Sequence, residues 1–143
     1  LIDTGTLSGK GSDSWTQYKL ISHIIKKGIY SIDYLIISKP GIITFKSAYF
    51  ICNNLQVKNI YIANWNASIN NRGWKAWNDL LNVCKQHQIK IELINTKPIK
   101  LILNESENIF ITPENYIRKN NFNYPKISIN LDLSNNKTII QNH

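Results

Sequence analysis

Residues 32–63 read IDYLIISKPGIITFKSAYFICNNLQVKNIYIA, which has the pattern of a strand, a helix and a second strand. The apolar run Ile32–Ser38 predicts a strand, which Pro40 and Gly41 bring to an end. Apolar residues at helical spacing predict a helix over Phe45–Leu55, and β-branched and aromatic residues predict a strand over Val57–Ala63. Two strands joined through a helix are typical of a parallel pair with a helical crossover.

A further helix is predicted on either side of this stretch. The earlier helix ends at Gly28, and its apolar positions are Trp15, Tyr18, Ile21, Ile24 and Ile25. The later helix spans Trp74–His87, and its apolar stripe is Trp74, Trp77, Leu80, Leu81 and Cys84. From this stripe we expect Trp77, Leu81 and Cys84 to be buried, and a strand over Ile89–Ile94 follows.

The remainder of the chain predicts strands separated by Asn-rich turns. These strands are Ile99–Leu103, Ile109–Thr112, Ile127–Leu133 and Thr138–Ile140, and residues 1–3 read as the end of another. Successive strands without intervening helices predict antiparallel hairpins. Because no internal repeat or interdomain linker is visible, we expect residues 1–143 to form a single domain. The expected fold class is α/β, with a layered α+β architecture.

The composition excludes several classes of protein. The 143 residues are 43% hydrophobic and 18% charged, unlike a disordered chain. No run approaches the ~20 apolar residues that span a bilayer, and we expect no signal peptide. Cys52 and Cys84 form no CxxC motif, which excludes a zinc knuckle. We expect them to be buried free thiols, with a disulfide between them as the alternative.

The net charge of +8 suggests a nucleic-acid partner, but the kind of cation argues against a specific one. Of the 17 basic residues only Arg72 and Arg118 are arginines, and arginine is the usual reader of base edges. A bias of the genome toward A/T-rich codons produces the same excess of lysine. The net charge is therefore compatible both with a nucleic-acid partner and with codon bias alone.

Three stretches occur in the order found in one superfamily. They are LIDTG at residues 1–5, KGIYSIDYLIIS at residues 27–38 and VKNIYI at residues 57–62. Together they resemble the metallo-β-lactamase fold, and most of the chain is similar to the soluble domain of the ComEC family of DNA-uptake channel proteins. The resemblance implies an αββα sandwich, incomplete at its N-terminus. It also implies the soluble part of a bacterial membrane protein.

The resemblance fails at the residues that carry the family's chemistry. The positions that match the metal signature H-x-H-x-D-H hold Lys39, Gly41, Ile43 and Thr44, and none of these is a useful ligand for a divalent cation. Asp3 matches the aspartate that supports the metal loop, and the alternative is a strand-end aspartate bonded to the amides of Thr4 and Gly5. We therefore expect a degenerate site, with no catalytic residue, metal or cofactor.

What the resemblance leaves is a DNA-guiding or docking surface. The candidate phosphate contacts near the former active-site edge are Lys10, Lys39, Lys46 and Arg72, and the candidate stacking residues are Trp65 and Trp74. For Trp74 the alternative is a place in the core of its helix. The implied partners are single-stranded DNA, bound weakly and with a dependence on salt, and a membrane channel domain outside this chain.

Two other functions stay open. One is an active metal-dependent hydrolase or nuclease whose ligands are not recognised in the sequence. The other is a plain protein-interaction domain with no role in DNA binding.

Overall fold

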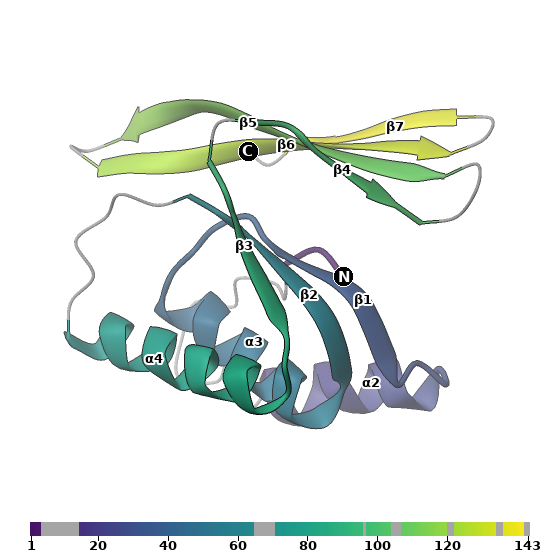
Figure 1. The fold of residues 1–143 in the computed structure, drawn as a ribbon, viewed down its shortest axis with the longest axis vertical. Helices are drawn as coiled ribbons and strands as arrows, with labels where there is room; N and C mark the ends of the chain where they lie inside the picture. Colours follow the sequence, from purple (N-terminus) through teal and green to yellow (C-terminus); the bar gives the residue numbers. More distant parts are fainter. Residues whose placement is uncertain are drawn as a thin grey trace. The chain divides into compact units, whose positions relative to one another are not determined.

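The computed structural model describes residues 1–3, 15–64, 71–95, 97–103, 107–119, 122–133 and 136–141. They form two compact units, the first containing the helices and β1, the second containing β4 to β7, with the division falling within β2 and β3 (Figure 1). The expected mixture of helices and strands is confirmed. The expectation of a single domain stays a prediction. None of the described helices has the length and hydrophobicity needed to cross a lipid bilayer.

The first unit is built on the three-stranded sheet β1-β2-β3. In chain order its elements are the π-helical segment η1 (Trp15–Leu20), α2 (Ile21–Lys26), β1 (Ser31–Ile37), α3 (Ile42–Asn54), β2 (Gln56–Ala63), α4 (Asn71–Gln86) and β3 (Lys90–Ile94). β1 and β2 are parallel, as predicted, with Ser31 opposite Gln56 and Ile37 opposite Ile62. The two crossovers advance in one direction across the sheet, which places α3 and α4 on the same face (Figure 1).

The ends of the helices follow from local chemistry. Gly28 has a φ of 77°, and the bonds Gly28 N to Ile25 O and Ile29 N to Ile24 O form the two-bond motif that ends many helices. The predicted stop at Gly28 is therefore confirmed. α3 begins at Ile42, three residues before the predicted start at Phe45, because the chain becomes helical directly after Gly41.

Burial confirms most of the predicted core and corrects part of it. The side chains of Leu35, Phe45, Ile60, Ile62 and Leu80 are fully buried. Both cysteines are buried free thiols, as expected. Of the three side chains expected to be buried on α4, Cys84 is buried and Trp77 is half-buried, but 36% of Leu81 is exposed, so that prediction is wrong. Two other apolar positions of the predicted helices, Tyr18 and Trp74, have exposed fractions of 65% and 50%. The buried stripe of α4 instead runs through Gly73, Ala76, Leu80, Val83 and Cys84.

The N-terminal residues extend the first sheet beside β1. The amide of Ile36 donates to the carbonyl of Leu1, and the amide of Asp3 donates to the carbonyl of Ile36, each over 2.9 Å. Ile2 and Ile36 form a parallel bridge. The prediction that these residues end a strand is therefore confirmed in part, since the pairing is a single bridge.

The second unit contains the four-stranded sheet β4-β5-β6-β7. Its strands are β4 (Ile99–Ile102), β5 (Asn108–Lys119), β6 (Phe122–Leu133) and β7 (Asn136–Gln141), and neighbours are antiparallel as predicted. β5 and β6 are longer than expected, with an irregularity between Glu114 and Ile117. The buried side chains of this unit include Leu101, Ile109, Ile111, Ile127 and Ile129.

Candidate functional site

The candidate site is the turn that leads from the end of β1 into α3. In open parallel sheets, ligands bind beyond the carboxyl ends of the strands, where the following helices begin. Residues 38–41 form this turn, so Lys39 and Gly41 lie in it, while Ile43 and Thr44 lie in the first turn of α3. All four positions that match the metal signature are therefore at this edge of the sheet.

Thr44 and Gly41 have local roles in this turn. The Thr44 side chain is buried, and its hydroxyl donates to the carbonyl of Lys39 over 2.9 Å and to that of Gly41 over 3.0 Å. Gly41 has a φ of 176°, which is extended backbone open to any residue, and a Cβ there would have no heavy atom within 4 Å. The hydroxyl of Thr44 thus fastens the turn to the helix, and the glycine is not a steric requirement.

Asp3 holds the same turn from the other side. Its Oδ1 accepts the amide of Ser38 over 2.8 Å, and its Oδ2 accepts the hydroxyl of Ser38, a residue that is buried. Asp3 has a φ of 42°, a left-handed conformation that aspartate tolerates better than most residues. The carboxylate therefore ties the N-terminal segment to the end of β1, beside the signature positions. The alternative bonds to Thr4 and Gly5 lie outside the described residues.

Two lysines flank the start of α3. Lys39 precedes the helix, Lys46 lies in its second turn, and both side chains are exposed. The backbone amides at the start of a helix carry partial positive charge, which attracts anions. This end of α3 is therefore positive both through its side chains and through its backbone.

The remaining candidates divide between described and undescribed residues. Trp74 lies in the first turn of α4, and its exposed fraction of 50% overturns the interpretation that it is a core residue. Since α4 follows β2, this turn lies at the same edge of the sheet as the start of α3. The backbone of Arg72 belongs to α4, but its side chain, like Lys10 and Trp65, lies outside the described residues.

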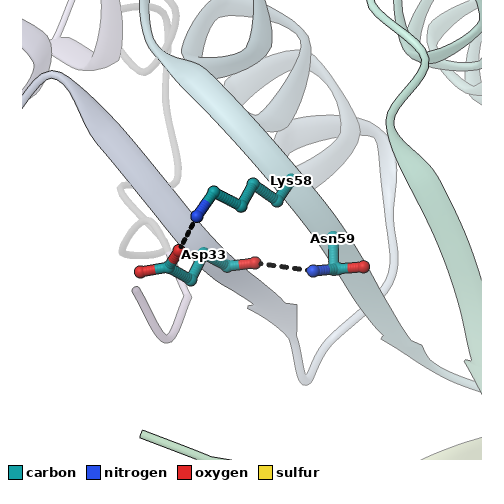
Figure 2. Close-up of polar contacts among 3 residues, drawn as sticks. All are labelled: Asp33, Lys58 and Asn59. Carbon is teal, nitrogen blue, oxygen red and sulfur yellow. Dashed lines mark hydrogen bonds and ion pairs between the residues drawn. The ribbon is translucent and has the colours of Figure 1, made fainter.

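A second polar cluster lies in the first halves of β1 and β2 (Figure 2). Lys58 Nζ is 2.6 Å from Asp33 Oδ1, and the Asn59 side-chain amide donates to the Asp33 carbonyl over 3.1 Å. The hydrogen bond and charge of Lys58 lower the pKa of Asp33, and Asp33 raises the pKa of Lys58. Sequence analysis missed this pair, although strand pairing of Ile32 with Val57 places Asp33 beside Lys58.

Among the described residues, no group of three or more His, Cys, Asp or Glu side chains is placed to bind a metal ion. No protein-family model matches the sequence, and no curated protein matches it significantly.

Proposed function

We propose that this chain is a metallo-β-lactamase-like domain of the ComEC type that has lost metal-dependent catalysis and guides single-stranded DNA along one edge of its first sheet. The observation that carries the proposal is the pair of exposed lysines, Lys39 and Lys46, at the start of α3. Lys39 stands at a position where the resemblance expects a metal ligand. The ammonium group of the lysine attracts a phosphate at this position without the need for a bound metal ion.

The same edge offers a surface for a base. Trp74 in the first turn of α4 has a half-exposed indole, and stacking of a base on an aromatic ring contributes about 1–3 kcal/mol. Lysine contacts to phosphate and stacking on tryptophan are both independent of sequence. We therefore expect weak binding to single strands, without preference for particular bases.

The test replaces both lysines with glutamine and measures affinity for a single-stranded oligonucleotide across a range of salt concentrations. Each phosphate contact contributes ~0.7–0.9 to the slope of log K against log salt, so Lys39→Gln with Lys46→Gln lowers the slope by roughly one to two units. The matched control is Lys26→Gln with Lys27→Gln. These lysines are also exposed, but they precede β1, whose seven residues separate the two sites by ~20 Å.

An unchanged slope in the Lys39/Lys46 variant, or an equal loss in the control variant, contradicts the proposal. Absence of binding by the unmodified protein at ~50 mM salt contradicts it as well. That last result favours a protein-interaction domain, for which the structure offers one observation. Trp74 and Leu81 are both exposed and lie two turns apart on α4, so they share one side of the helix.

A further inference from the structure

α3 and α4 pack against each other as parallel neighbours. Each helix returns from the carboxyl end of one strand to the amino end of the next, so the two helices run in the same direction on one face of the sheet. The rings of Phe45 and Trp77 contact each other with centroids 5.1 Å apart. This contact shows which turns of α3 and α4 lie opposite each other.

The same alignment of the two helices places the two cysteines of the chain opposite each other, further along both helices. Cys52 follows Phe45 by seven residues and Cys84 follows Trp77 by seven residues, which is about two helical turns in both cases. Each cysteine lies two residues before the end of its helix. Both side chains are buried, and the two thiols are close enough for each to shift the pKa of the other.

We propose that Cys52 and Cys84 are a redox-active pair that closes into a disulfide joining α3 to α4. A disulfide requires Cα atoms within about 4.4–6.8 Å, closer than the 8–10 Å typical of helix axes. Ala48 lies three residues after Phe45 and four before Cys52, so it shares their side of α3, and it is fully buried. A side chain as small as this lets the two backbones approach.

The reaction takes oxidised glutathione, a small-molecule disulfide, as the oxidant. The Cys84 thiolate attacks one glutathione sulfur, and the first glutathione thiolate leaves. Cys52 then gives up its proton and attacks Cys84 Sγ in the mixed disulfide, which releases the second glutathione thiolate. Two protein thiols are oxidised to one disulfide, and one glutathione disulfide is reduced to two glutathione molecules, which carry the two protons.

The order of attack follows from the two environments. The interaction between the two thiols lowers the pKa of Cys84 and, together with burial, raises the pKa of Cys52. Cys84 therefore has the greater thiolate fraction and attacks first. Cys84 is buried near the end of α4, and its carbonyl accepts the amide of Ile89 over 2.8 Å, so local opening of this helix end precedes the attack.

The experiment incubates the folded 143-residue chain with oxidised glutathione and compares it with the same chain kept in dithiothreitol. We expect the intact mass to fall by two hydrogen atoms. Trypsin after alkylation should then release residues 47–58 joined to residues 76–85, since Lys46, Lys58, Lys75 and Lys85 bound these peptides. A cross-link across a loop of this length raises the melting temperature by roughly 5–15 °C.

The variants Cys52→Ala and Cys84→Ala are the controls, and neither should show the joined peptides or the rise in melting temperature. If a variant does not fold, the peptide map of the unmodified protein still decides. Two free thiols after incubation, or a separate glutathione adduct on each cysteine, overturns the proposal. So does a cross-link that forms only when urea is added, because it then belongs to the unfolded chain.

Discussion

Asp33 and Lys58 stand side by side on β1 and β2, and their contact is local to the two side chains. Both are exposed, so solvent screens the ion pair and it contributes little to stability. The nearby amide of Asn59, which donates to the carbonyl of Asp33, adds a directional contact between the same two strands. A shift of one residue in the strand pairing would lose both contacts, so the pair specifies register more than stability.

The replacement Lys58→Met should raise the pKa of Asp33 toward its ordinary value. In the unmodified protein the bond to Lys58 holds the pKa of Asp33 below its usual 3.8. A carboxyl group whose pKa is lower in the folded state stabilises the fold at pH values above its unfolded-state pKa. This stabilisation is lost as the pH falls through the folded-state pKa, so the effect lies in the acid range below about 4. Carboxyl carbon NMR titration measures it.

The control for this titration is Lys90→Met, which removes a lysine 3.6 Å from Glu92 on β3. That change should leave the Asp33 midpoint where it is. An Asp33 midpoint that does not move in Lys58→Met would assign the lowered pKa to another cause. High salt should reduce the difference between the two variants, because the pair is exposed.

At the level of elements, α4 provides a matched pair of adjacent leucines. Leu80 has no exposed surface, whereas 36% of Leu81 is exposed. Replacing Leu80 with alanine should lower the free energy of unfolding by about 2–5 kcal/mol, the cost of removing a core leucine side chain. Leu81→Ala should cost less than about 1 kcal/mol, and urea denaturation of both variants measures the difference. Equal losses would show that the helix faces the sheet differently.

The course of α4 also shows where sequence reasoning succeeds and where it stops. The existence and type of the helix follow from its apolar period, which is why the prediction for Trp74–His87 lies close to the observed Asn71–Gln86. Which face of the helix is buried does not follow from that period. The large side chains of Trp74 and Leu81 dominate the apolar pattern although they are exposed, whereas the small residues Gly73 and Ala76 are buried. The signal that could have found that face is the spacing of small residues.

Similar limits apply to the other elements. The strands of the first unit were predicted nearly to the residue because they are continuous apolar runs. β5 and β6 were predicted too short because their polar ends, around residues 114–119 and 122–126, have no apolar pattern, and each strand contains a proline. At the candidate site, the contact of Asp3 with Ser38 depends on pairing between distant segments, which local patterns do not encode.

For the whole molecule, metal content separates the proposed function from an active hydrolase. The signature positions hold lysine, glycine, isoleucine and threonine, and a hydrolytic metal centre needs imidazole, thiolate or carboxylate ligands. We expect elemental analysis of the dialysed chain to find well below one zinc or manganese ion per molecule. The measurement covers every residue, including those outside the described part. A stoichiometric ion that resists chelators would favour the hydrolase.

The strand pairings also set the order in which the parts of the molecule assemble. Ser31 pairs with Gln56 only after all of α3 has passed between them, whereas Lys119 pairs with Phe122 across a two-residue connection. Closing a long loop costs more conformational entropy than closing a short one, and distant contacts form slowly. We therefore expect the β5–β6 hairpin to form early, while the apolar strand β1 stays unpaired for longer. Because an unpaired apolar strand can associate with other chains, we expect aggregation during folding to begin in the parallel unit more often than in the antiparallel one.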